Sequence, residues 1–240
     1  MRRTISSEFS WAAKQAAATK RQTKRCIVWF YHLTMSPFLH TPSKPSGHGL
    51  VLTHGAGANA QAPLLLRVAE AFAGAGWFVL RYNLPFRQRK PFGPPSPAAA
   101  AADRDGLRAA VAELKQMAEH VSLGGHSYGG RQASMLAAES PDLVEALLLL
   151  SYPLHPPKKP EQLRTAHFAQ LRTPALFVSG TKDEFGTVDE IKSAIALIPA
   201  KTELQIIEGA GHDLKKGAFN LNLILGGAGA FACLRRPMPS

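Results

Sequence analysis

The segment GGHSYGGRQ at residues 124–132 constrains the fold of this chain more than any other part of its sequence. An apolar run at residues 121–123 precedes it, and an alanine-rich stretch follows it. Ser127 stands in a G-x-S-x-G turn, which raises a serine hydroxyl above a sheet between a strand and a helix. Side chains at Gly125 and Gly129 would collide with the neighbouring strand or helix. The segment therefore predicts a strand, a sharp turn that exposes Ser127, and a helix.

Apolar runs and helical patterns alternate along the rest of the chain. The runs typical of strands fall at residues 49–53, 77–82, 121–125, 146–151, 174–180 and 203–207. Helical patterns lie between them, at about residues 62–75, 98–119, 128–139 and 187–197. Continuous apolar strands separated by helices indicate a parallel sheet covered on both faces. We therefore expect an α/β fold with a doubly wound, mostly parallel sheet.

Two further strand ends carry the partners that a nucleophilic serine needs. Such a serine requires a base to take its proton and a carboxylate to orient that base. Asp183 follows the run at 174–180, and His212 lies in a glycine-rich loop after the run at 203–207. Loops after parallel strands meet at one edge of a sheet, where such folds place their sites. The order Ser127, Asp183, His212 therefore predicts a catalytic triad.

The identity of the acid stays open within one loop. Asp189 and Glu184 lie close enough in the sequence to replace Asp183 as the partner of the histidine. Asp183 itself has a second interpretation, as a turn former or the N-cap of a helix.

The loop after the first strand predicts the site of a developing negative charge. The run at 49–53 ends in HGAGAN, whose small residues let the backbone approach a substrate closely. An oxyanion in acyl transfer needs backbone N–H donors, one from the residue after the nucleophile and one from an early loop. These donors are predicted at Tyr128 and Ala56. We expect His54 and Gly55 to support this loop rather than transfer protons.

Several segments together resemble a known family. The chain is similar to α/β-hydrolases of the dienelactone-hydrolase-like kind, and within them to the branch that includes a testis-expressed hydrolase-like protein and a subunit of the NSL chromatin complex. The matching segments are LTHGAGAN (52–59), RYNLPFRQ (81–88), GGHSYGGRQ (124–132), SYPLHPP (151–157), SGTKDEFGT (179–187) and EGAGHDL (208–214). The resemblance implies a doubly wound sheet with Ser127, Asp183 and His212 as triad. It indicates the fold and the catalytic residues more than it indicates the substrate.

Two connections bear on the size of the substrate. The connection at 151–173 is too short for a large cap domain, so we expect none. The proline-rich segment at 85–97 has two interpretations: a stiff lid that borders the cleft with positive charge, or a solvated surface connection. The charged residues of this segment are Arg87, Arg89 and Lys90.

The net charge of +11 belongs to the two ends of the chain. Residues 1–48 hold eight basic and one acidic residue, whereas residues 49–213 hold 16 of each. A nucleic-acid-binding domain needs a basic face, so we predict no nucleic-acid partner. We expect a basic N-terminal extension with one edge strand (26–33) over residues 1–48, the α/β-hydrolase domain over 49–214, and an atypical apolar, glycine-rich tail over 215–240.

The two ends of the chain and its two cysteines bear on the cellular location of the protein. Residues 2–25 resemble a transit peptide superficially, although an upstream extension from a misassigned start codon is the favoured interpretation. Residues 217–234 are too short and too polar for a membrane span, so no stable membrane insertion is expected. Cys26 and Cys233 lie far apart and offer neither a disulfide framework nor metal spacing. We therefore predict a cytoplasmic protein without a metal or a cofactor.

Two classes of function follow from the sequence. The first is a serine hydrolase that cleaves an ester, thioester or related acyl bond of a small substrate through an acyl-enzyme intermediate. The second is a catalytically idle interaction module on the same fold. The presence of nucleophile, acid, base and oxyanion loop favours the first. We expect His126 only to pack beside the turn, and the other histidines to have no role in the site.

Overall fold

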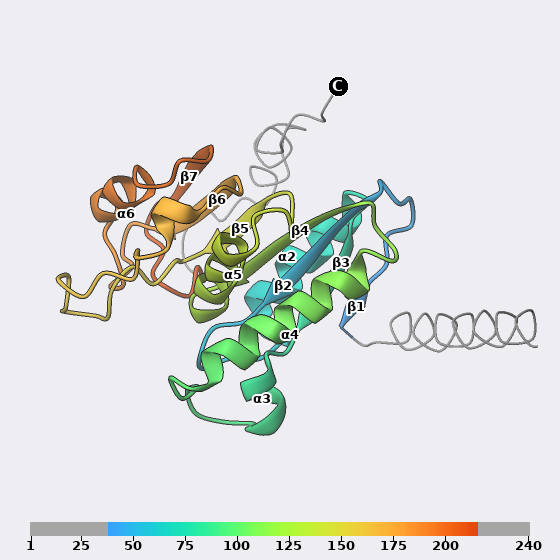
Figure 1. Ribbon diagram of the computed structural model, residues 1–240, viewed down its shortest axis with the longest axis horizontal. Coiled ribbons are helices and arrows are strands. Elements are labelled where there is room, and N and C mark those ends of the chain that lie inside the picture. Colours follow the sequence, from blue (N-terminus) through green and yellow to red (C-terminus); the bar gives the residue numbers. More distant parts are fainter. Residues whose placement is uncertain (1–37, 216–240) are drawn as a thin grey trace, which may run out of the picture. The chain divides into compact units, whose positions relative to one another are not determined.

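The computed structural model describes residues 38–215, which form a seven-stranded sheet with helices on both faces (Figure 1). This is the doubly wound α/β architecture that the sequence predicts. The strands are β1 (Leu39–His40), β2 (His48–Thr53), β3 (Phe78–Tyr82), β4 (His120–His126), β5 (Leu147–Leu150), β6 (Ala175–Gly180) and β7 (Thr202–Ile207). The helices are α2 (Pro63–Gly74), α3 (Pro85–Arg89), α4 (Ala99–Leu114), α5 (Tyr128–Glu139) and α6 (Val188–Ile195), with a short 3₁₀ turn η1 (Phe168–Gln170).

The order of the strands creates a crevice at one edge of the sheet. The order is β1-β3-β2-β4-β5-β6-β7, and every pairing from β3 through β7 is parallel. The chain leaves β2 toward β3 and then returns to place β4 on the other side of β2. The loops after β2 and β4 therefore diverge at a topological switch point, where open α/β sheets bind their ligands.

The two faces of the sheet are buried by different helices. Figure 1 shows α4 and α5 across one face and α2 across the other. Within β2, Leu50 and Leu52 belong to the core on the α2 side, because alternate residues of a strand point to the same face. Val51 points to the opposite face and is equally buried. The burial of both faces explains why the strands are apolar without alternation.

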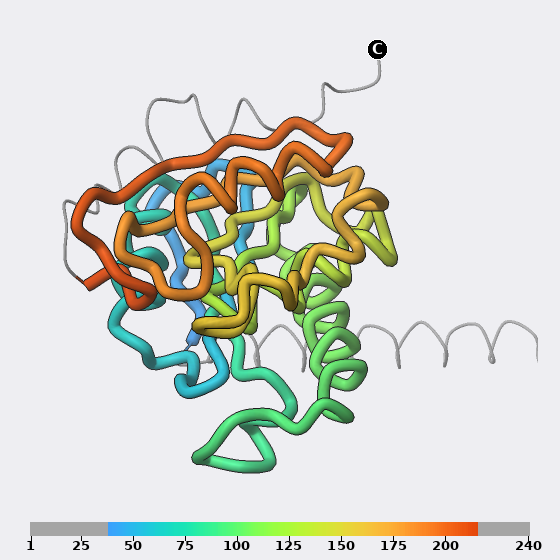
Figure 2. Tube along the Cα trace, turned by 90° about the vertical axis from the view of Figure 1, so that its left-hand side faces the viewer, coloured from blue at the N-terminus to red at the C-terminus, as the bar shows by residue number. Residues whose placement is uncertain are grey.

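The connection between β5 and β6 holds η1 and no larger element, so the expected absence of a large cap domain is confirmed for the described chain. The segment after β3 differs from the expectation of a proline-stiffened loop, since it begins with α3 and extends beyond the sheet in Figure 2. Pro85 opens that helix, a position where its missing N–H costs nothing. The predicted edge strand at 26–33 and most of the C-terminal tail lie outside the described residues.

The helices of residues 38–215 are all too short or too polar to cross a membrane.

Gly129 tests the packing between α5 and the end of β2. A Cβ atom on Gly129 would lie 2.6 Å from the carbonyl oxygen of His54 and 2.7 Å from Thr53 Cγ2. We expect Gly129→Ala to lower the free energy of unfolding by about 1–3 kcal/mol, because backbone atoms must shift to make room. Chemical denaturation measures this change. The matched control is Gly74→Ala at the end of α2, where a Cβ meets nothing within 4 Å; equal losses in the two variants would contradict the packing argument.

Candidate active site

Ser127 sits in a strained turn between β4 and α5. Its backbone has φ +52° and ψ −118°, a region that residues with a side chain rarely adopt. The Ser127 N–H donates to the Leu150 carbonyl at 2.9 Å, which fixes the turn against β5. A Cβ on Gly125 would lie 2.7 Å from the backbone of Gly129 and of the next residue. The glycines thus allow the close crossing of strand and helix that presents the serine hydroxyl.

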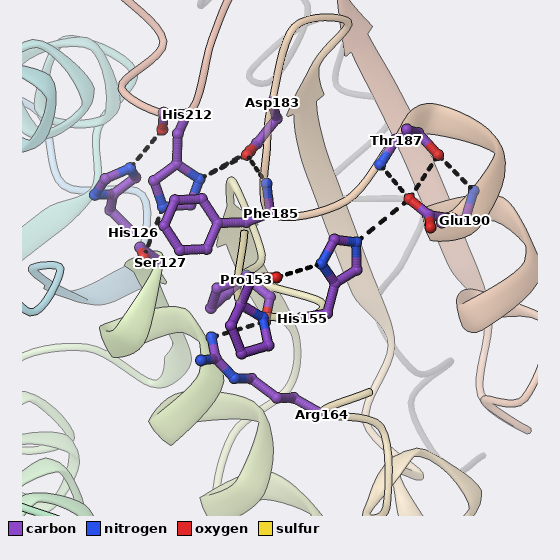
Figure 3. Close-up of polar contacts among 11 residues, drawn as sticks. His126, Ser127, Pro153, His155, Arg164, Asp183, Phe185, Thr187, Glu190 and His212 are labelled. Carbon is purple, nitrogen blue, oxygen red and sulfur yellow. Dashed lines mark hydrogen bonds and ion pairs between the residues drawn. The ribbon is translucent and has the colours of Figure 1, made fainter. Parts of the chain in front are cut away.

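Ser127, His212 and Asp183 form a continuous chain of hydrogen bonds (Figure 3). His212 Nε2 lies 2.8 Å from Ser127 Oγ. His212 Nδ1 lies 2.9 Å from both carboxylate oxygens of Asp183. The side chain of Asp183 is 3% exposed and that of His212 is 22% exposed. The carboxylate is therefore shielded from water, while the imidazole reaches the cavity.

Two aromatic residues contact His212, one through its ring and one through its backbone carbonyl. Phe185 stacks on the imidazole with ring centroids 4.0 Å apart, and its backbone N–H donates to Asp183 Oδ1 at 2.9 Å. On the other side, His126 Nε2 lies 2.8 Å from the His212 carbonyl oxygen and donates to it. Burial lowers the pKa of His126 to about 4, so this ring is neutral near pH 7. His126 therefore contacts the histidine loop directly, a role that the sequence did not reveal.

Ala56 and Tyr128 belong to the lining of the cavity around Ser127. Within residues 38–215, no backbone carbonyl accepts either N–H. Tyr128 is the first residue of α5, where helical N–H groups have no partner inside the helix. Its hydroxyl donates to Asp103 Oδ2 at 2.8 Å, which anchors the side chain away from the serine. Both N–H groups are thus available to a negatively charged oxygen in the cavity.

His54 links the loop after β2 to the segment after β3. The fully buried ring accepts the N–H of Leu84 at Nε2, at 3.1 Å. Its Nδ1 therefore carries the proton and donates to the Gly55 carbonyl at 2.9 Å. Burial is the main reason that the pKa of His54 falls to about 4. The neutral ring bridges two backbone segments and lies in no contact with Ser127 that would suit proton transfer.

Arg87 fixes the same loop from α3. Its guanidinium donates to five backbone carbonyls, with donor–acceptor distances of 2.7–3.1 Å. Two of these carbonyls belong to Ala56 and Ala58, and the other three to the residues that follow α3. Arg87 is only 6% exposed. Of the two interpretations of the segment at 85–97, a lid that borders the cleft with positive charge is therefore wrong for Arg87, whose buried guanidinium is bonded to carbonyls of the protein itself.

The cavity around Ser127 has a volume of about 470 Å³. Arg89 and Lys90 lie at a different hollow, of about 280 Å³, so they do not border this cavity either. No group of three or more metal-ligating side chains occurs between residues 38 and 215. The cavity is lined by Gly55, Ala56, Gly57, Ala58, His126, Ser127, Tyr128, Arg131, Pro153, Arg164, Phe185 and His212.

The structure thus brings together the residues that the sequence selected for the site. The two alternative acids lie elsewhere, since Asp189 pairs with Lys192 on α6 and Glu184 is exposed. Sequence reasoning missed Asp103, which is fully buried and also accepts the Phe86 N–H. The sequence could have indicated that Asp103 is buried, because it lies four residues before Leu107, on the apolar side of the helical pattern.

Comparison with known proteins agrees with this geometry. Residues 46–219 match the model of a family described as an alpha/beta hydrolase domain, which covers well over half of the chain. The chain belongs to this family.

Solved structures share the fold. A dienelactone hydrolase from Anabaena variabilis is 22% identical, with a TM-score of 0.60 over 78% of this chain and 85% of that one. Est1E from Butyrivibrio proteoclasticus is 18% identical, with a TM-score of 0.60 over 78% and 88% of the two chains. A Xanthomonas campestris protein, described as an α/β serine hydrolase without a lid, is 15% identical, with a TM-score of 0.63 over 84% and 89%. At these identities the likeness concerns the fold of this α/β hydrolase.

Arg87 provides a test of how the loop after β2 is held. We expect Arg87→Met to lower the free energy of unfolding by about 3 kcal/mol or more, because five carbonyls lose the buried, charged donor that joins them. Denaturant titration measures the loss. The control, Arg89→Met, removes the same charge from an exposed position on the same helix. A similar, small effect of both variants would show that the buried network does not stabilise the fold.

Proposed function

We propose that this α/β hydrolase is a serine hydrolase that cleaves an ester, thioester or related acyl bond of a small substrate. The observation that carries the proposal is the unbroken hydrogen-bond chain from Ser127 through His212 to Asp183. Ser127 and His212 line a cavity together with Ala56 and Tyr128, whose N–H groups have no backbone acceptor among residues 38–215. An idle interaction module has no need of this alignment, so the geometry favours the enzyme.

The first half of the proposed reaction forms an acyl-enzyme. Ser127 Oγ attacks the substrate carbonyl carbon while His212 Nε2 takes the hydroxyl proton. Asp183 accepts the Nδ1–H of His212, so Nε2 faces the serine as a base. The carbonyl oxygen becomes an oxyanion that the N–H groups of Ala56 and Tyr128 stabilise. The tetrahedral intermediate then collapses, and His212 gives its proton to the departing alcohol or thiol.

The second half returns the free enzyme. His212 takes a proton from a water molecule, and the resulting hydroxide equivalent attacks the acyl carbon. The same N–H groups stabilise the second oxyanion. The carbon–Oγ bond breaks, Ser127 recovers its proton from His212, and a carboxylic acid leaves. His212 transfers the proton in both acylation and deacylation, so the rate of each half-reaction depends on the orientation of its ring.

Two finer points rest on the sequence alone. The quoted motifs support a place in the branch with the testis-expressed hydrolase-like protein and the NSL-complex subunit. The two widely separated cysteines support a cytoplasmic location.

Replacement of the nucleophile tests the proposal directly. We expect Ser127→Ala to abolish labelling by a fluorophosphonate probe, because the probe bonds to the activated hydroxyl. Turnover of p-nitrophenyl esters should fall by several orders of magnitude. Gel fluorescence and a colorimetric assay measure the two effects. Full labelling of Ser127→Ala would show that the reactive group is another residue and would contradict the proposal.

The acid is tested by an amide substitution of the same shape. Asp183→Asn should keep the fold and lower kcat by roughly 10⁴, because the amide favours the wrong tautomer of His212. Steady-state kinetics and melting temperature separate the two effects. Asp189→Asn is the matched control, since its side chain is 93% exposed and pairs only with Lys192 on α6. A larger loss of kcat in Asp189→Asn would overturn the assignment of the acid.

A further inference from the structure

Two arginines line the cavity around Ser127, and neither has a carboxylate partner in the described part of the chain. Arg131 and Arg164 belong to its lining. Among residues 38–215, no Asp or Glu forms an ion pair with either guanidinium. Arg104, on the neighbouring α4, contrasts with them, because it pairs with Glu139 at 2.9 Å. The cavity therefore carries positive charge that the described protein does not neutralise.

Arg131 is the fourth residue of α5 and lies at the end of its first turn. Its N–H donates to the Ser127 carbonyl at 3.0 Å, so the backbone of Arg131 is bonded directly to that of the serine. The Nε atom of Arg131 is buried and finds no acceptor among the described residues. Buried donors nearly always have partners in folded proteins, and a charged donor without one is costly.

Arg164 enters the cavity from the connection between β5 and β6. Its backbone is held on both sides of the Cα atom, since its N–H donates to the Leu154 carbonyl and its own carbonyl accepts the buried Tyr152 hydroxyl. One guanidinium N–H reaches the Pro153 carbonyl at 3.3 Å (Figure 3). The remaining donors have no acceptor in the described chain. The backbone and one hydrogen bond thus position the guanidinium, and most of its N–H donors are left for a ligand.

The two charges also influence one another. Burial lowers the pKa of Arg164, and the positive charge of Arg131 lowers it further. An anion in the cavity would relieve this repulsion and accept the unused N–H groups. Guanidinium groups bind carboxylates and phosphates through paired, charge-assisted hydrogen bonds.

We propose that Arg131 and Arg164 bind an anionic group of the substrate, so that the enzyme acts on small acyl esters or thioesters that carry a carboxylate or a phosphate near the scissile bond. The inference rests on the proposed hydrolase function and names its substrate class. Because Ser127, Arg131 and Arg164 line one cavity, the anionic group is expected in the same cavity as the reacting carbonyl.

Matched ester pairs test the proposed charge preference. The p-nitrophenyl monoester of adipic acid carries a carboxylate on the acyl part, and its methyl-capped form is neutral. The pair 4-acetoxybenzoate and methyl 4-acetoxybenzoate carries the same difference on the leaving group. In a third pair, 4-acetoxyphenyl phosphate and its neutral dimethyl ester, a phosphate replaces the carboxylate. We expect kcat/KM to be roughly tenfold or more higher for a charged member than for its neutral partner. The arm with the largest ratio identifies the anion and its side of the ester.

Variants connect the preference to the two arginines. Arg131→Met and Arg164→Met should each lower the charged-to-neutral ratio by roughly tenfold, mainly through KM, because a desolvated ion pair is lost. Arg131→Lys should retain part of the ratio. Arg89→Met removes a charge outside the cavity and should leave the ratio unchanged. Melting temperatures identify variants that fail to fold; for these, Arg131→Lys and Arg164→Lys replace the Met variants in the comparison.

Calorimetry gives a readout independent of turnover. Adipate and inorganic phosphate are titrated into Ser127→Ala, with and without Arg131→Met, and tighter binding to the protein that keeps Arg131 is expected. A ratio near one in the wild-type enzyme, or equal ratios in the wild type and both Met variants, would overturn the inference. The hydrolase proposal then still stands as long as Ser127 is labelled. Loss of labelling with anion binding intact would overturn the hydrolase proposal instead.

Discussion

The close crossing of α5 and the end of β2 is the contact on which the site depends. Gly129 packs against the His54 carbonyl with no room for a methyl group. This distance sets how near the serine turn lies to the loop that begins at Gly55. Both flank the cavity because β2 and β4 are adjacent parallel strands in register, with Thr53 opposite Gly125. A wider crossing would separate the nucleophile from the N–H group that the early loop supplies.

Buried cationic and neutral side chains then give this loop its shape. A loop of small residues has little side-chain packing of its own, and ordering its backbone costs about 1–2 kcal/mol per residue. Arg87 offsets this cost by donating to its carbonyls from the segment after β3. His54, at the start of the loop, donates to the Gly55 carbonyl and accepts the N–H of Leu84 from that segment. Asp103 holds both that segment and the Tyr128 hydroxyl. The loop after β2, the start of α3 and the start of α5 are therefore one connected hydrogen-bonded unit.

Much of this arrangement could be predicted from the sequence, for physical reasons. Uninterrupted apolar runs identify strands buried on two faces, and the six predicted strands appear within one or two residues of their expected bounds. The parallel sheet then dictates that Ser127, Asp183 and His212 meet at one edge. The role of Arg87 could not be read in this way. Its five acceptors are backbone carbonyls, which every residue carries, so no residue type in the sequence marks them.

The connection between β5 and β6 lies outside the elements that hold the reacting centre, although it lines the same cavity. The chemistry is held by strand ends and by the glycine contact, which tolerate little change. The lining opposite the nucleophile comes partly from this connection, which contains only a single 3₁₀ turn and contributes Pro153 and Arg164. Insertions and substitutions there leave the sheet registers untouched. The scaffold can thus diversify the molecules it accepts while the reacting centre stays constant.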